Sequence, residues 1–163
     1  MRDFLTHFEA WSNSKDRQPM ILQGQRQVGK SYFIKNESIH ALLPNAKIHT
    51  IDFIKDQSAK KIFDSYQNIK EVLDRIELHL NVKININCDL LFFDEIQESG
   101  KAIQSLKYFY EDLPQLRVVS AGSYLGIMAN QLGKFEKAVE LLNEAIAITP
   151  NFAPNYNHLG NAL

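Results

Sequence analysis

The alternation of apolar and polar positions along the first three quarters of the chain predicts short strands separated by helices. Apolar runs bounded by turn residues predict strands at 20–23, 48–53, 90–93 and 117–121. Apolar residues at helical spacing predict helices at 3–12, about 29–40, 58–80 and 101–112. The third of these is either one helix or two helices with a break near Gln67-Asn68. We therefore expect an α/β fold with a parallel sheet and flanking helices.

The pattern changes at Tyr124, after which no strand is predicted. A helical stripe ends at Pro150, and a second helix is expected to begin at Ala153-Pro154, because proline is tolerated in a first helical turn. The stripe consists of Phe135, Ala138, Val139, Leu142, Ala145, Ile146 and Ile148. The expected organisation is an α/β domain at 1–124 followed by an all-α helical hairpin at 125–163.

Composition narrows the possible classes of protein. The chain has 163 residues with 45% hydrophobic and 23% charged residues, which is enough apolar material for a packed core. A net charge of −1 gives no evidence for binding to nucleic acid or to an anionic membrane. The lone cysteine, Cys88, excludes an internal disulfide, and no signal peptide or membrane-spanning run is visible. We expect a soluble cytoplasmic protein.

The main candidate for chemistry is the turn between the first strand and the following helix. It reads G-x-x-x-x-G-K-S, the spacing of a phosphate-binding loop, formed by Gly24, Gln25, Arg26, Gln27, Val28, Gly29, Lys30 and Ser31. Inward-pointing N–H groups of such a turn and the start of the helix attract anions, so the expected contacts extend to Tyr32. Lys30 is expected to reach the β- and γ-phosphates and Ser31 to ligate Mg²⁺. The alternative is a glycine-rich turn that fits the pattern by chance.

Acidic and hydroxyl residues follow two of the predicted strands. Asp94 and Glu95 end the apolar run at 90–93, where Asp94 would hold Mg²⁺ and Glu95 would polarise the attacking water. Solvated acids at a strand end are the alternative. Ser123 follows the last strand and is the preferred sensor of the γ-phosphate, with Ser120 as the alternative and an ordinary strand-end serine equally plausible.

Two other residues have open interpretations. Asp52, at the end of the second strand, either faces the nucleotide or faces solvent, and we prefer solvent. Trp11 either stacks on a base or packs in the core with the other apolar residues of helix 3–12, and we prefer packing.

Residues 1–126 resemble the AAA-type P-loop ATPases of bacteria and archaea that carry a C-terminal DUF4143 domain. The matching stretches are GQRQVGKS at 24–31, LLFFDEIQ at 90–97, SLKYFYEDLPQ at 105–115 and VVSAGSYLG at 118–126. The resemblance implies ATP and Mg²⁺ as cofactors, Lys30 and Ser31 as their contacts, and Asp94 with Glu95 as the acidic pair. It also implies an incomplete AAA core here, which leaves strand 20–23 at a sheet edge.

Residues 124–163 are similar to a tetratricopeptide (TPR) repeat and the first helix of a second one. The similarity consists of Leu125-Gly126, Leu132-Gly133, Phe135, Ala138, Ala145, Pro150, Tyr156, Leu159, Gly160 and Ala162. Because the YLG of 124–126 fits both patterns, we expect a fusion junction there. This resemblance implies a protein partner, or self-association through the repeat.

The sequence thus leaves three functional hypotheses. The first is an ATP-binding protein with weak or absent hydrolysis and an appended interaction repeat. The second is a TPR-type interaction or scaffold protein in which nucleotide is structural or irrelevant. The third is a recombined gene product without a selected activity.

Overall fold

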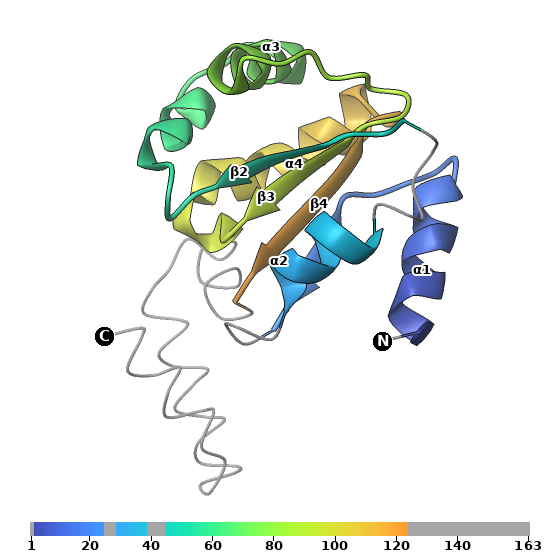
Figure 1. The fold of residues 1–163 in the computed structure, drawn as a ribbon. Coiled ribbons are helices and arrows are strands. Elements are labelled where there is room, and N and C mark those ends of the chain that lie inside the picture. The colour runs from blue at the N-terminus through green and yellow to red at the C-terminus, as the bar shows by residue number, and fades with distance from the viewer. Residues whose placement is uncertain (1, 25–28, 39–44, 124–163) are drawn as a thin grey trace, which may run out of the picture.

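The protein forms one parallel sheet with helices on both faces, in a computed structural model that describes residues 2–24, 29–38 and 45–123 (Figure 1). The strand order is β1-β4-β3-β2, and each neighbouring pair is parallel. The strands are β1 (Met20–Gln23), β2 (Ile48–Asp52), β3 (Leu90–Asp94) and β4 (Arg117–Gly122). The predicted α/β class is therefore confirmed, and the predicted strands are present with only small differences at their ends.

The helices follow the predicted order, with changes in helix type. They are α1 (Arg2–Asn13), α2 (Lys30–Tyr32), the π-helix η1 (Phe33–Glu37), the 3-10 helices η3 (Gln57–Phe63) and η4 (Ile96–Glu98), α3 (Ile69–Leu80) and α4 (Gly100–Asp112). The helix predicted at 29–40 thus starts as an α-helix but widens to a π-helix after Tyr32, which sequence periodicity does not reveal. Positions 39–40 lie outside the described residues.

The region 58–80 contains two helices, as one of the two interpretations predicted. Asn68 is in an extended conformation, and its side-chain oxygen accepts a hydrogen bond from the backbone N–H of Glu71 at 3.0 Å. This N-cap starts α3 and explains the break, since asparagine favours that position. The part before the break is the 3-10 helix η3 rather than an α-helix.

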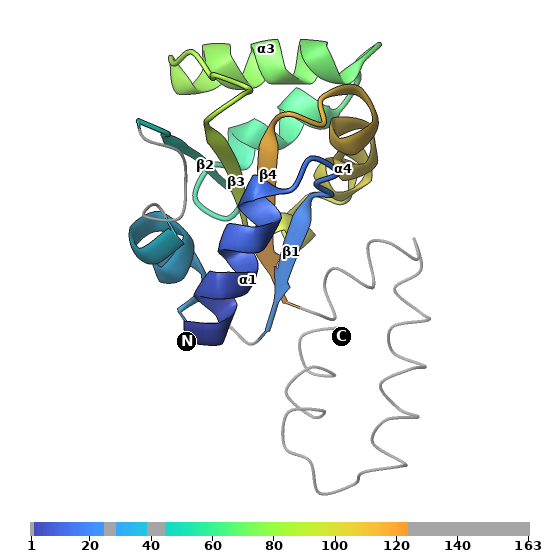
Figure 2. The same cartoon turned by 90° about the vertical axis from the view of Figure 1, so that its right-hand side faces the viewer.

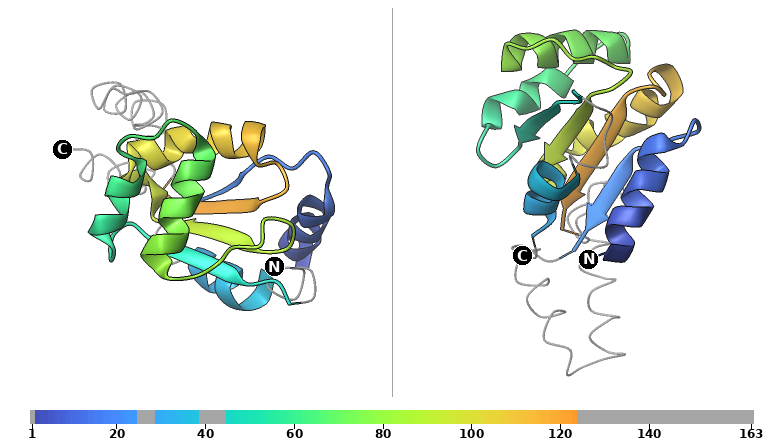
Figure 3. Two further views of the ribbon diagram at one scale, coloured as in Figure 1. Left: turned by 90° about the horizontal axis from the view of Figure 1, so that it is seen from above. Right: turned by 45° about the vertical axis from the view of Figure 1, so that its right-hand side comes forward.

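Both faces of the sheet are buried, which explains the unbroken apolar run of β3. On one face, the ring of Phe93 has its centroid 5.7 Å from that of Phe63 on η3 and 6.0 Å from that of Phe109 on α4. α3, α4 and η3 contribute the buried side chains of this face. Phe92 lies on the opposite face, which α1 and η1 cover (Figure 3).

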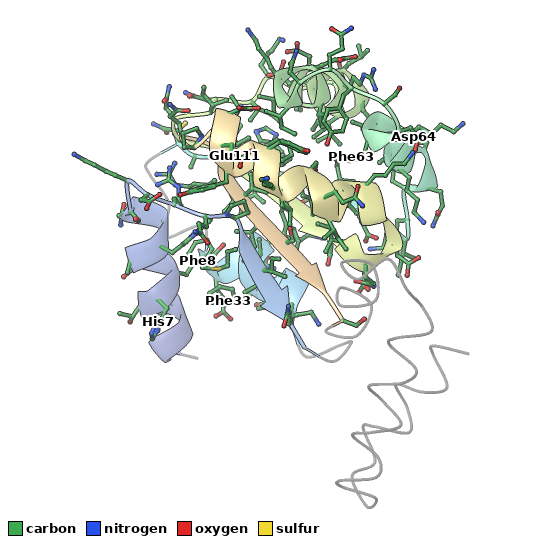
Figure 4. All side chains as sticks on the ribbon, turned by 180° about the vertical axis from the view of Figure 1, so that it is seen from behind. His7, Phe8, Phe33, Phe63, Asp64 and Glu111 are labelled. Carbon is green, nitrogen blue, oxygen red and sulfur yellow. The ribbon has the colours of Figure 1, made fainter. Side chains whose placement is uncertain are left out.

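The N-terminal helix is fixed to this second face by aromatic contacts. Phe8 of α1 is fully buried, and its ring centroid lies 6.0 Å from Phe33 of η1 (Figure 4). Trp11 packs 5.3 Å from Phe8, and its indole N–H donates to the carbonyl oxygen of Gln18 at 2.7 Å. The preferred interpretation of Trp11 as a packing residue is therefore confirmed.

The strand β1 lies at an edge of the sheet in the described part of the chain, beside α1 (Figure 2). Its partner is β4, with Met20 opposite Val119 and Gln23 opposite Gly122. The prediction of an edge position for 20–23 is thus confirmed for these residues. The predicted helical hairpin at 125–163 lies outside the described residues.

Candidate functional site

The predicted site residues come from segments that meet at the end of the sheet where the carboxyl ends of the strands lie. Because β1, β3 and β4 are parallel, their carboxyl ends lie at the same edge, where ligands of open α/β sheets bind. Gly24 follows β1, Asp94 ends β3 and Ser123 follows β4. The fold therefore brings together three segments that are far apart in the sequence.

A hydroxyl and a carboxylate form the centre of this arrangement. The Ser31 hydroxyl donates a 2.8 Å hydrogen bond to Oδ1 of Asp94. The Asp94 side chain is only 7% exposed, and its Oδ2 lies 3.5 Å from the ammonium of Lys35. The phenyl ring of Phe92 lies beneath that ammonium, at 5.7 Å from its centroid. Both oxygens of Asp94 are thus engaged by residues of the helix that follows the glycine-rich turn.

The structure describes both ends of the glycine-rich turn. Gly29 has φ 88°, a left-handed conformation that glycine adopts without steric cost, and its carbonyl accepts the first helical hydrogen bond from Phe33 at 2.9 Å. Lys30 donates to the carbonyl oxygen of Gly24 at 2.9 Å, across the turn. The predicted contacts Gln25, Arg26, Gln27 and Val28 lie outside the described residues. Tyr32 is 63% exposed on α2.

Glu95 belongs to a second group, which includes a residue that the sequence analysis missed. Glu95 has φ 53°, an uncommon value for a residue with a side chain, and it is the N-cap residue that precedes the 3-10 helix η4. The Gln97 amide donates to Oε2 of Glu95 at 2.6 Å and accepts from the backbone N–H of Ser123 at 3.3 Å. Gln97 therefore links the glutamate to the end of β4. Its position two residues after Glu95 was visible in the sequence, but nothing there indicated this bridge.

The two serines proposed as sensors differ in environment. Ser123 is half-buried just beyond β4. Ser120 is fully buried within β4, and its hydroxyl has no hydrogen-bond partner among the described residues. Of the two, Ser123 is the one that follows the strand.

Asp52 is half-buried at the end of β2, opposite Asp94 in the sheet register, and its orientation toward nucleotide or solvent stays a prediction. Its side chain is 17% exposed, and it accepts hydrogen bonds of 3.1 Å from the backbone N–H groups of Ile54 and Lys55. Burial would raise the pKa of Asp52, but these hydrogen bonds and the Lys55 ammonium lower it below the ordinary value. Asp52 stabilises the turn that follows β2.

The residues at this edge fit a magnesium ion bound beside a phosphate. Mg²⁺ prefers oxygen ligands and uses few of them from the protein, and Ser31 with Asp94 offers a hydroxyl and a carboxylate 2.8 Å apart. Lys30, at the start of the helix, adds a positive charge next to the turn. The donor set is thus of the kind that a metal–phosphate complex needs.

Comparisons with known proteins are consistent with this architecture. No curated protein matches the chain. Within residues 2–24, 29–38 and 45–123, no helix has the length and apolar character to cross a bilayer. A TPR repeat model matches residues 128–163, and an AAA domain model matches residues 16–139. The two matches overlap at residues 128–139, and the boundary at 124/125 and the relation to DUF4143-bearing ATPases stay predictions. Because the AAA domain model covers well over half of the sequence, the chain belongs to the AAA domain family.

Proposed function

We propose that this protein binds ATP together with Mg²⁺ at the carboxyl ends of the strands β1, β3 and β4. The observation that carries the proposal is the 2.8 Å contact between Ser31 and Asp94. It joins the helix that follows the glycine-rich turn to the acidic end of a neighbouring strand. Membership of the AAA domain family supports nucleotide as the ligand.

Each residue has a distinct task in this proposal. The turn from Gly24 to Gly29 surrounds the phosphates, and Lys30 turns from the Gly24 carbonyl toward the β- and γ-phosphates. Ser31 and Asp94 would hold Mg²⁺, which when bound offsets negative charge on the phosphates. Glu95 orients the attacking water, and Ser123 contacts the γ-phosphate.

We further propose that hydrolysis is slow. Among the arginines whose side chains the structure describes, each has partners away from the site: Arg17 binds the carbonyl of Gln115, Arg75 that of Ser65, and Arg117 that of Asn87. An arginine that stabilises the transition state of phosphoryl transfer contributes a factor of about 10³–10⁵ to the rate. The described part of the chain offers no arginine for this role. We therefore expect the protein to bind ATP but to hydrolyse it slowly.

A nucleotide titration tests the binding proposal. The affinity for a fluorescent ATP analogue is measured for wild type, Lys30→Ala and the control Lys101→Ala, since Lys101 is exposed and pairs with Asp64 at 3.1 Å. We expect Lys30→Ala to weaken binding at least about tenfold and the control to match wild type. Equal affinity in wild type and Lys30→Ala, or no binding in either, would reject the proposal.

The match of a TPR model to residues 128–163 favours a second role, in protein interaction. We propose that this segment is an appended binding element, with its junction at the YLG of 124–126. Removal of residues 127–163 tests this. If residues 1–126 alone are soluble and bind ATP, the segment is an appended binding element. If they aggregate, the segment covers the edge strand β1. A full-length chain that proteases degrade rapidly would favour the recombined, inactive gene product.

A further inference from the structure

Lys35 lies at the candidate metal site, although the glycine-rich motif assigns it no role. It follows Ser31 by one helical turn, so both side chains point to the same side of the helix. Ser31 binds Oδ1 of Asp94 at 2.8 Å, and the Lys35 ammonium lies 3.5 Å from Oδ2. One carboxylate is therefore shared between the expected metal-binding hydroxyl and a lysine.

The burial of Asp94 gives this contact its importance. Its side chain is 7% exposed, and a buried carboxylate is unfavourable unless a positive charge or hydrogen bonds compensate it. Lys35 is 38% exposed, and it is the basic residue that the described structure pairs with Asp94. Phe92 adds a cation–π contact at 5.7 Å, which holds the ammonium above the sheet.

A divalent cation at the same carboxylate would meet this positive charge. Two like charges about 4 Å apart repel strongly even near a protein surface. The long lysine stem, partly exposed, allows the ammonium to swing into solvent when a metal arrives. The contact would thus compete with a metal ion bound at Asp94, while it compensates the charge of Asp94 in this structure.

We propose that Lys35 is an internal counter-ion of Asp94 that Mg²⁺ must displace, and that it sets the Mg²⁺ concentration required for tight nucleotide binding. This inference rests on the proposed function, because it concerns the same site. It makes Lys35 a residue that determines metal affinity, not a contact of the nucleotide.

The test is a Mg²⁺ titration of the full chain at a fixed concentration of a fluorescent ATP analogue. The free Mg²⁺ concentration that gives half of the binding change is measured for wild type, Lys35→Met and Lys35→Arg. Lys107→Met is the matched control, because Lys107 is an exposed helical lysine that faces Glu111 at 3.6 Å. Each protein is also titrated with the analogue in EDTA.

Lys35→Met should lower the half-saturating Mg²⁺ concentration about tenfold, because it removes the competing charge and keeps the apolar stem. Lys35→Arg should retain most of the competition, and Lys107→Met should match wild type. In an Asp94→Asn background, Lys35→Met should have no further effect. Lys35→Gln repeats the measurement with a second neutral side chain if the methionine variant is poorly folded.

Two results would overturn the inference while the proposed function stands. In the first, all variants bind nucleotide with the same Mg²⁺ requirement. In the second, Lys35→Met weakens binding in EDTA, which would make Lys35 a phosphate contact. Absence of nucleotide binding in every protein, wild type included, would reject the proposed function and this inference together.

Discussion

The Ser31 hydroxyl donates a 2.8 Å hydrogen bond to Oδ1 of Asp94, 63 positions later in the chain. The contact places the end of a buried strand against the first turn of the helix that follows Gly29. A hydroxyl and a carboxylate already within hydrogen-bond distance can both ligate one Mg²⁺ ion, so this geometry is the main support for the proposed site.

Ser31 and Asp94 should act on nucleotide binding through the same metal. Ser31→Ala and Asp94→Asn are each expected to weaken MgATP binding about tenfold, because each removes an oxygen ligand or its charge. The double variant should be little worse than either single one, since groups that serve one ligand are not additive. The dissociation constants of the four proteins check this, and fully additive losses would indicate independent roles.

Gln97 should influence turnover and not binding. Gln97→Leu removes the amide that donates to Glu95 at 2.6 Å and accepts from Ser123 at 3.3 Å. We expect single-turnover hydrolysis about tenfold slower, because the glutamate is no longer held at the strand end. The affinity for ATP should stay within about twofold of wild type. A loss of affinity that parallels the loss of rate would contradict a positioning role.

Ser120 should be replaceable with a gain in stability. Its hydroxyl is buried without a hydrogen-bond partner among the described residues, and an unsatisfied buried group costs about 1–3 kcal/mol. Ser120→Ala should raise the free energy of unfolding by roughly 1 kcal/mol in urea. The equally buried Ser105 donates to the carbonyl of Ala102 at 2.7 Å, so Ser105→Ala is the control and should give no gain. Destabilisation by Ser120→Ala would show that its hydroxyl has a partner.

Asp89 should make stability depend on pH. It is buried immediately before β3 begins, and its Oδ2 lies 2.9 Å from Nε2 of the buried His49. Burial would raise the pKa of Asp89, but hydrogen bonds from His49 and from the backbone N–H groups of Lys47 and Asn85 lower it below the ordinary value. A carboxyl with a lowered folded pKa stabilises the protein above its unfolded pKa of about 3.9 and loses this effect as the pH falls toward the folded value.

Asp89→Asn should therefore reduce the free energy of unfolding by about 2 kcal/mol at pH 7, because it removes a buried carboxylate that accepts hydrogen bonds. The gap from wild type should narrow as the pH falls below about 4. Urea unfolding from pH 7 to pH 3 measures both effects, with the exposed Asp112→Asn as the control. A gap of constant size over this range would mean that ionisation of Asp89 does not stabilise the fold.

The elements that were predictable from the sequence are those with strong local signals. β1 at 20–23 matches its prediction because a short apolar run followed by glycine leaves few alternatives. The break before α3 was one of the two alternatives that the sequence left open, and the structure shows that Asn68 caps the helix there. Strand burial on both faces was readable from the run at 90–93, since a parallel sheet covered on both sides needs no polar alternation.

The features that the sequence did not reveal depend on contacts between distant segments. The elements β2, η3 and α3 lie between Lys35 and its partner Asp94 in the sequence. The π-helix η1 changes hydrogen-bond spacing without changing apolar periodicity enough to detect. The Gln97 bridge requires η4 and the end of β4 to be adjacent, which only the folded sheet provides.

A crystal structure of the full chain with Mg²⁺ and a non-hydrolysable ATP analogue tests the central claim most directly. The account predicts phosphate density against the turn from Gly24 to Gly29, with the metal between the phosphates and the pair Ser31 and Asp94. Lys35 should have moved away from Asp94. Nucleotide bound at another surface, or density for the metal away from both Ser31 and Asp94, would contradict the account.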